Sequence, residues 1–203
     1  MTKLALAGFL AALAGTVDAI GYLHLGGLFV SFMSGNSTQL GAALGQGDLA
    51  EAGIIAKLIV LFVIGSAAGQ IVAAFAGTRH LAWVLITVVL LLALAAVLGT
   101  APEPMVLAMG ALNASLRRAG SIPVSLTFVT GVLVRFGQGL GDFLTGRATE
   151  PEWLLQGVPW VGLIAGVTLG TVTYDWIGEA AIWLPVILAG VLAACTAAMP
   201  EPE

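Results

Sequence analysis

The chain alternates between long apolar runs and short polar connections. Most of the runs are apolar throughout, but two of them carry several polar residues at their centres. A stretch of about 20 apolar residues is long enough to cross a bilayer as a helix. The pattern therefore predicts eight helical segments, at 4–23, 28–46, 54–77, 81–99, 105–116, 124–146, 155–174 and 180–199.

The composition places these segments in a membrane. Hydrophobic residues make up 59% of the 203 residues, charged residues only 9%, and the mean hydropathy is +1.05, whereas about a quarter of the residues of a soluble domain are charged. We therefore predict an all-α integral membrane protein that forms a single transmembrane domain over residues 1–203, surrounded by the lipid bilayer. The net charge of −4 comes without a basic patch, so we expect no nucleic-acid partner.

The two halves of the chain resemble each other. Each half ends on the tripeptide Pro-Glu-Pro, at 102–104 and 200–202. A shift of about 96 residues places "VSFMSGNSTQLGAAL" over "LTFVTGVLVRFGQGL", so that Gly35 matches Gly131 and Gln39 matches Arg135; with one gap, Asp18 matches Asn113. Agreement in motif and in the order of segments predicts two internal repeats, at 1–101 and 102–203.

The orientation of the repeats depends on the two polar-centred segments. If these segments re-enter the membrane, each half has three crossings and the repeats are inverted; if they span it, each half has four and the repeats are parallel. With three crossings per half, most basic residues lie on the cytoplasmic side, and Lys57 is the one clear exception. We therefore expect inverted repeats of three plus three spanning helices, with four plus four as the alternative.

The polar stretch at 34–39 lies at membrane depth. Non-helical backbone is tolerated there only inside protein or beside water. We expect Ser34 to cap a half-helix running from Asn36 to about Leu44, with a matching start at Thr130 and Gly131 in the second half. Such helix starts direct N–H groups towards a bound solute. A candidate site then contains Ser34, Gly35, Asn36, Thr38, Gln39, Thr130 and Gly131; the alternative is that the small residues serve helix packing.

Two ionisable residues extend this candidate site. Asp18 lies among apolar residues within the first segment, where an ionisable group is costly and is therefore a functional candidate. It could carry a proton, bind a cation or pair with Arg135, or it could reach the interface. Arg135 could hold an anionic group in its fork of donors, or extend to the interface. Asn113 is included as the counterpart of Asp18.

Signatures of catalysis are missing from the sequence. It contains no phosphate-binding loop of the Walker type, no His-x-x-x-His pair, no G-x-S-x-G elbow and no spaced set of metal ligands. We therefore predict that the protein is not an enzyme and has no cofactor or metal.

Three stretches together resemble a known family. "GTVDAIGYLHLGGLFVSFMSGNSTQLGAAL", "GALNASLRR" and "TFVTGVLVRFGQGLGD" are similar to sequences of the YoaK family of small bacterial inner-membrane proteins, whose function is not settled. The resemblance covers nearly the whole chain and implies a multi-pass protein of the bacterial cytoplasmic membrane. It also implies motif roles for Asp18, Gly35, Asn36, Thr38, Asn113 and Gly131. The second copy departs from the first at Val132, which stands where the first copy has Asn36.

These observations predict a function in membrane transport. We expect a secondary transporter of a small polar or anionic solute, with the site at the half-helix ends near the bilayer midplane and with Asp18 as the residue that could couple transport to a proton. A passive channel and a non-transporting scaffold or accessory subunit are the alternatives. Because so short a chain leaves a small cavity between the repeats, we expect a homodimer.

Overall fold

The computed structural model describes residues 3–115, 129–147 and 151–198 as helices and their connections, with no strand among these residues. Each predicted segment overlaps one α-helix, although the third and fifth helices begin several residues earlier than predicted. The elements in chain order are α1 (Lys3–His24), α2 (Met33–Gln46), α3 (Leu49–Phe75), η1 (Gly77–Arg79), α4 (His80–Val97), α5 (Pro102–Ser115), α6 (Val129–Leu144), η3 (Pro151–Gly157), α7 (Val158–Ile177), η4 (Gly178–Ile182) and α8 (Trp183–Ala197). The all-helical prediction is confirmed.

Four helical stretches of the described chain are long and apolar enough to cross a membrane. They are Leu4–His24, Leu49–Phe75, Gly77–Val97 and Trp153–Ala197, and the last of these includes both α7 and α8. Several crossings in one chain make the protein a multi-pass membrane protein, as the composition predicts.

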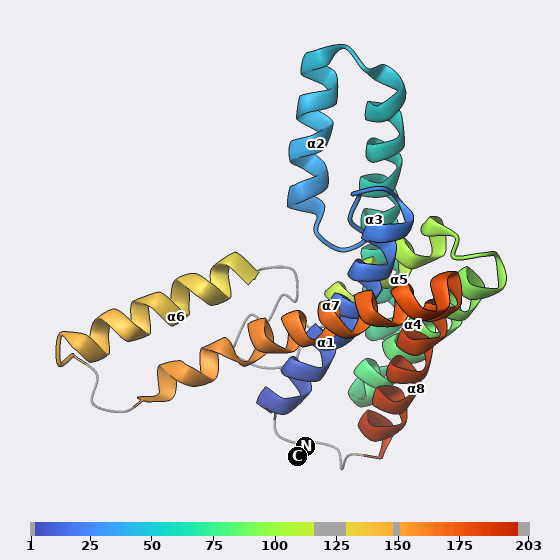
Figure 1. The fold of residues 1–203 in the computed structure, drawn as a ribbon. Coiled ribbons are helices and arrows are strands. Elements are labelled where there is room, and N and C mark those ends of the chain that lie inside the picture. The colour runs from blue at the N-terminus through green and yellow to red at the C-terminus, as the bar shows by residue number, and fades with distance from the viewer. Residues whose placement is uncertain (1–2, 116–128, 148–150, 199–203) are drawn as a thin grey trace.

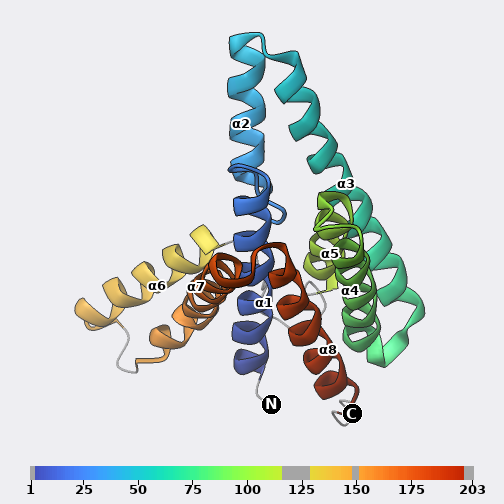
Figure 2. The same ribbon diagram turned by 45° about the vertical axis from the view of Figure 1, so that its right-hand side comes forward.

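The helices form a central bundle from which two hairpins project. The α2–α3 hairpin and the α6–α7 hairpin point away from the bundle in different directions (Figures 1 and 2). The buried core lies between α1, α4, α5 and α8, where large side chains are fully covered; they include Leu10, Leu13, Leu85, Leu92, Met105, Met109 and Leu112.

Glycines bring α1 and α7 into backbone contact. A Cβ atom added to Gly166 would collide with the carbonyl oxygen of Ala12, and one added to Gly170 would lie 2.7 Å from the carbonyl oxygen of Thr16. From the first contact to the second, the residue number rises by four in both helices, so α1 and α7 run parallel. Small residues permit this close approach, which is a common way to pack helices in membranes.

The same type of contact joins α3 and α5. Gly65 lies against Leu107, and a Cβ atom added to Gly69 would be 2.6 Å from the backbone of Ala111. These two contacts match the contacts of Gly166 and Gly170 in the first seam. The residue numbers of equivalent contacts differ by 95 between α1 and α5. They differ by 101 between α3 and α7.

A third pair of contacts follows the same numbering. Gly15 of α1 lies against Leu163 and Val167, and Gly110 of α5 lies against Phe62 and Ser66. Helix α1 therefore contacts α7 of the other half as α5 contacts α3. Because α1 and α3 run in opposite directions (Figure 2), each of α1 and α3 also runs opposite to its counterpart in the second half.

Lys57 is paired with an acid across the α3–α5 seam. Its Nζ donates a hydrogen bond to Oε1 of Glu103 at 2.6 Å, and both side chains are more than one third exposed. With three crossings per half, the charge count predicts that Lys57 lies on the side of the membrane opposite to most basic residues. The pairing gives a physical reason for the exception, because the acid neutralises the charge of Lys57 locally.

Replacing Lys57 by methionine is expected to change stability little. Exposed ion pairs contribute about 0.2–1 kcal/mol, since water screens both charges. The melting temperature of Lys57→Met in detergent should therefore stay close to that of the wild type, and Glu103→Gln should behave alike. A loss comparable to that of a core substitution would show that the pair is buried in the membrane-embedded protein.

Candidate functional site

The connection between α1 and α2, residues 25–32, is held by side chains from both helices. Asp18 of α1 is buried, with 3% of its surface exposed. Its Oδ1 accepts hydrogen bonds from the backbone N–H groups of Val30, at 3.0 Å, and Ser31, at 2.8 Å. The hydroxyl of Ser31 donates to Oδ2. Both carboxyl oxygens are therefore engaged by the loop, and the predicted pairing of Asp18 with Arg135 is not among the ion pairs of the described residues.

Asn36 of α2 holds the loop from the opposite side. Its Oδ1 accepts from the backbone N–H of Phe29 at 3.0 Å, and its Nδ2 donates to the carbonyl oxygen of the same residue at 2.7 Å. Asn36 is fully buried. Because buried backbone groups need partners, the amide replaces the hydrogen bonds that a helix or a strand would otherwise supply to Phe29.

Gln39 completes the set of contacts from α2. Its Nε2 donates to the carbonyl oxygen of Gly27 at 3.1 Å. Asp18, Asn36 and Gln39, three residues predicted to line a solute site, thus converge on one loop. We call residues 25–32 together with these three side chains the loop clamp.

Glycine and aromatic residues close the packing around the clamp. A Cβ atom on Gly35 would lie 2.9 Å from the ring of Phe29, and one on Gly21 would lie 2.6 Å from Val30. The ring of Phe29 packs between those of Tyr22 and Phe32, with centroids 5.0 and 5.7 Å away. Gly35 is therefore needed for contact with the loop rather than for breaking the helix.

The predicted start of α2 is wrong by a few residues. Ser34 is not the cap; α2 begins at Met33, its N-cap is Phe32, and no side chain bonds to the cap. The carbonyl oxygen of Phe32 accepts from the N–H groups of Gly35 and Asn36. The helix starts earlier because the clamp fixes the backbone up to Ser31, so that Phe32 can already accept the first helical bonds.

The hydroxyl residues of α2 remain accessible. Ser34 and Thr38 are exposed, and the hydroxyl of Thr38 donates to the carbonyl oxygen of Ser34 at 3.1 Å. Back-bonding of this kind is ordinary for Thr within a helix and leaves the oxygen free to accept a further hydrogen bond.

The second-half candidates lie apart from the loop clamp. Thr130 is exposed and Gly131 is partly exposed in the first turn of α6. Asn113 donates to the carbonyl oxygen of Met109 at 2.9 Å. The segment that corresponds to the clamped loop falls within residues 116–128, outside the described residues.

Arg135 lies in α6, about one helical turn before Gly139, which packs against Trp153 of η3. Its Nε is buried without a hydrogen-bond partner among the described residues, as is Nε1 of Trp153. Trp153 packs beside Gly139 and against the ring of Phe136, 4.9 Å away. Two covered donors in the same hairpin are unusual, because buried polar groups are normally satisfied.

Comparison with known proteins identifies the chain. Residues 6–195 match a family described as a protein of unknown function, DUF1275. The chain belongs to this family. It is also similar to a UPF0700 transmembrane protein of Rhizobium meliloti (strain 1021), with 41% identity over 202 residues that cover 98% of this chain and 88% of the relative. No solved structure matches.

Membership of DUF1275 confirms the recognition of the chain as a YoaK-like membrane protein. The motif "VDAIGYL", with the following "FVSFMSGN", contains Asp18, Ser31 and Asn36. In this member of DUF1275, the motif encodes the loop clamp. The sequence analysis identified Asp18 and Asn36 but missed Ser31. The signal for Ser31 is a hydroxyl residue directly after the apolar residues 28–30, in the stretch that also contains Asn36.

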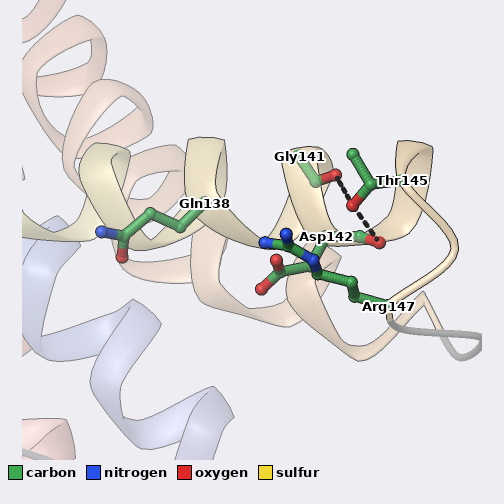
Figure 3. A pocket seen from close by; sticks show the side chains of 5 residues that line it. All are labelled: Gln138, Gly141, Asp142, Thr145 and Arg147. Carbon is green, nitrogen blue, oxygen red and sulfur yellow. Dashed lines mark hydrogen bonds between the residues drawn. The ribbon is translucent and has the colours of Figure 1, made fainter.

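Two cavities of the DUF1275 chain lie beside α6. The polar one, of about 490 Å³, is lined by Gln138, Gly141, Asp142, Thr145 and Arg147. Its residues come from the end of α6 and the following turn, and the Thr145 hydroxyl is bonded to backbone oxygens of Gly141 and Asp142 (Figure 3). The apolar one, of about 670 Å³, lies between α1, α6, η3 and α7.

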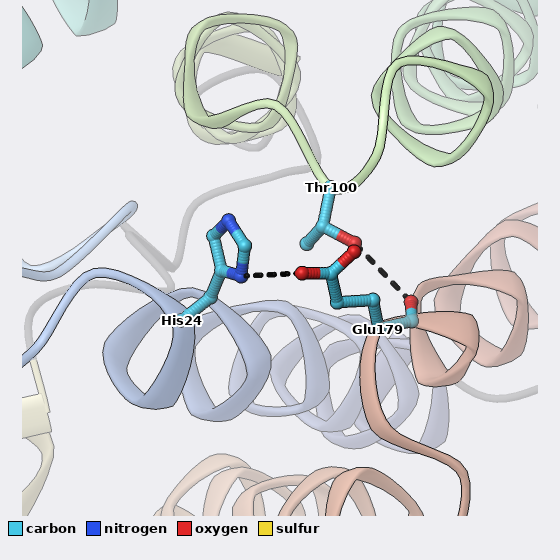
Figure 4. A network of polar contacts seen from close by, with 3 residues as sticks. All are labelled: His24, Thr100 and Glu179. Atoms are coloured by element: carbon cyan, nitrogen blue, oxygen red, sulfur yellow. Dashed lines mark hydrogen bonds and ion pairs between the residues drawn. The ribbon is translucent and has the colours of Figure 1, made fainter.

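A second polar cluster joins three connections. Nδ1 of His24 lies 3.8 Å from Oε1 of Glu179, and the hydroxyl of Thr100 donates to the carbonyl oxygen of Glu179 at 3.2 Å (Figure 4). Thr100 is buried and has a φ of 60°, a backbone conformation that is rare for a Thr residue. The cluster ties the end of α1 to the α4–α5 turn and to η4.

Proposed function

We propose that this DUF1275 protein is a secondary transporter of a small polar or anionic solute, built from two inverted repeats of three crossings each. The observation that supports it best is the paired α1–α7 and α3–α5 seams. Three glycine contacts of one seam, at Gly166, Gly170 and Gly15, have counterparts in the other at Gly65, Gly69 and Gly110, with constant differences of 101 and 95 residues. Inverted repeats of this kind are common among secondary transporters.

The directions of the helices favour inverted over parallel repeats. Helix α1 and its counterpart α5 run in opposite directions, as do α3 and α7, whereas parallel repeats would keep each pair aligned. In this proposal 1–101 and 102–203 are the two repeats of one domain. The segment 25–46, a clamped loop followed by the half-helix α2, is the broken element of the first repeat.

The contacts within the clamp change which residues are expected to meet the solute. The amide groups of Asn36 and Gln39 form hydrogen bonds with the loop. We therefore assign these two residues a role in shaping the site, together with Asp18, Gly35 and Asn113. The groups left for a solute are the hydroxyls of Ser34, Thr38 and Thr130 and the guanidinium of Arg135. A guanidinium with a covered, unpaired Nε favours an anionic or carbonyl-bearing solute.

Uptake into proteoliposomes tests the proposal. We expect purified protein to take up at least one member of a panel of inorganic anions, small carboxylates and amino acids with saturable kinetics. Arg135→Gln should lower the uptake of an anion about tenfold or more, since it removes a charge-assisted hydrogen bond. Arg79→Gln, in the exposed turn η1, is the matched control.

Two results of the uptake experiment would contradict the proposal. Flux that does not saturate and ignores a proton gradient would favour a passive channel. No flux of any tested solute, together with recovery of a partner that is lost on changing α2, would favour a scaffold or accessory subunit. The projecting α2–α3 hairpin, with many exposed apolar residues, is the feature that supports this second candidate.

The surroundings of the protein are part of the proposal. We place it in the bacterial cytoplasmic membrane, without catalytic activity, cofactor or metal, and as a homodimer. Gly41 and Gly45 of α2, and the matching Gly137 and Gly141 of α6, have no neighbour within 4 Å of the point where a Cβ atom would stand, which suits contact with a second copy. Native mass spectrometry in detergent tests the dimer, and a monomer at all concentrations would contradict it.

A further inference from the structure

The apolar cavity between α1, α6, η3 and α7 is an open groove. Its volume is about 670 Å³, and in the part of the chain that the structure describes it is lined only by aliphatic and aromatic side chains and by glycines. Phe9, Leu133, Leu154 and Val161, one from each of these elements, line it and are each more than 40% exposed. The groove is therefore accessible from the surroundings of the protein.

The groove follows the first halves of α1 and α7. These helices run parallel, and both belong to stretches that are long and apolar enough to cross a membrane. The groove extends from Ala5 to Ala12 on α1 and from Val158 to Ala165 on α7. Ala12 is nine residues beyond the first residue of α1, which is about 13 Å along a helix and close to half of the hydrocarbon thickness of about 30 Å. The groove thus has the direction and the length of a lipid tail within one leaflet.

The volume of the groove suits a lipid tail better than water or a helix. Apolar cavities stay dry. A helix is about 10–12 Å wide with its side chains, so one turn of it would fill most of the groove and leave too short a contact for a helical partner. A methylene group takes about the volume of one water molecule, about 30 Å³, so the groove holds about 20 of them, enough for one acyl chain.

The equivalent place in the first half of the chain is charged. A Cβ atom on Gly8 would lie 3.1 Å from the side chain of Val158, and both residues line the groove. The differences of 95 and 101 relate these two residues to Glu103 and Lys57, which form an ion pair at 2.6 Å. A lipid tail would remove this pair from water, which is costly. Apolar lining is therefore a property of the second-half seam alone.

We propose that the groove binds one acyl chain of a membrane phospholipid from the leaflet in which α1 begins. Among the described elements, α6 packs mainly on η3 and α7. A tail that lies between α6 and α1 supplies the apolar contact that joins the projecting α6–α7 hairpin to the bundle. Lipid binding in the groove depends on the membrane location of the chain and not on transport.

Native mass spectrometry tests the groove. Protein reconstituted with phosphatidylethanolamine and transferred to a mild detergent should retain a phospholipid on most chains. Ala165→Trp should lower the retained fraction about tenfold or more, because the indole ring takes the space of the tail and a packed groove does not hold both. Ala68→Trp is the matched control, since Ala68 is also exposed on a helix long enough to span the membrane but does not line the groove.

Four results would overturn the proposal. They are a wild type that retains no lipid, equal retention in the wild type and Ala165→Trp, retention of a free fatty acid in place of a phospholipid, and a lipid-free dimer that Ala165→Trp separates. The last result would assign the groove to a second copy of the chain.

Photolabelling keeps the proposal testable if Ala165→Trp fails to fold. A phosphatidylethanolamine with a diazirine in its tail, incorporated around the wild-type protein, should label the peptide of Val161 several times more than that of Val60. These two residues hold equivalent positions in the two halves and are 58% and 57% exposed, so passing lipids meet them equally. Equal labelling would overturn the assignment of a bound tail to the groove.

Discussion

Leucine in place of Gly65 or Gly166 is expected to prevent stable packing of the bundle. A Cβ atom at either position would collide with a backbone carbonyl of the partner helix, Leu107 for Gly65 and Ala12 for Gly166. Backbone cannot move aside as a flexible side chain can, so the helices must separate along the seam. We expect a loss of about 3 kcal/mol or more in the free energy of unfolding, seen as a lower melting temperature and poor recovery from detergent.

Gly53 supplies the matched control on the same helix as Gly65. It has no neighbour within 4 Å of the added Cβ position, so Gly53→Leu should leave stability near that of the wild type. Because Gly65 and Gly166 hold equivalent positions in the two seams, Gly65→Leu and Gly166→Leu should cost similar amounts. A large loss in only one of them would weaken the argument that the halves are equivalent.

The number and order of the helices could be predicted because apolar length is a local property. Each of the eight apolar runs overlaps one α-helix, and Pro or Gly residues lie at most of the breaks. The pairing of α1 with α7 and of α3 with α5 could not be predicted, since every run offers a similar apolar surface to its neighbours. Only the glycine contacts of the folded chain distinguish the partners.

The side chains of the candidate site could be predicted from the sequence, but their partners could not. Asp18 and Asn36 stood out because polar side chains are costly at membrane depth, and both lie in the loop clamp. Apart from the Ser31 hydroxyl, their partners in the loop are backbone groups of Phe29, Val30 and Ser31, which every sequence provides at every position. The sequence therefore indicated which side chains matter, but not that they bind a loop, and it misplaced the cap at Ser34.

Alanine in place of Asn36 is expected to release the loop from α2. The substitution removes the two hydrogen bonds to Phe29 and leaves a partly buried N–H and a partly buried C=O without the partners that Asn36 supplied. Each unsatisfied group costs about 1–3 kcal/mol, which gives a loss of about 2–4 kcal/mol for the pair after partial relaxation. Thermal unfolding in detergent and faster amide exchange at Phe29 would measure it.

Ser37→Ala is the control for this change, because Ser37 lies one position along the same helix, is exposed and bonds only to its own helix through Met33. It should change the melting temperature and the exchange at Phe29 little. The comparison also separates the two roles that the polar stretch could have. If Asn36→Ala keeps the loop protected and the protein stable but abolishes solute uptake, Asn36 acts on the solute and the clamp is not its function. If stability and loop protection fall together, the amide is a structural tie, and direct solute contact is left to the exposed hydroxyls and Arg135.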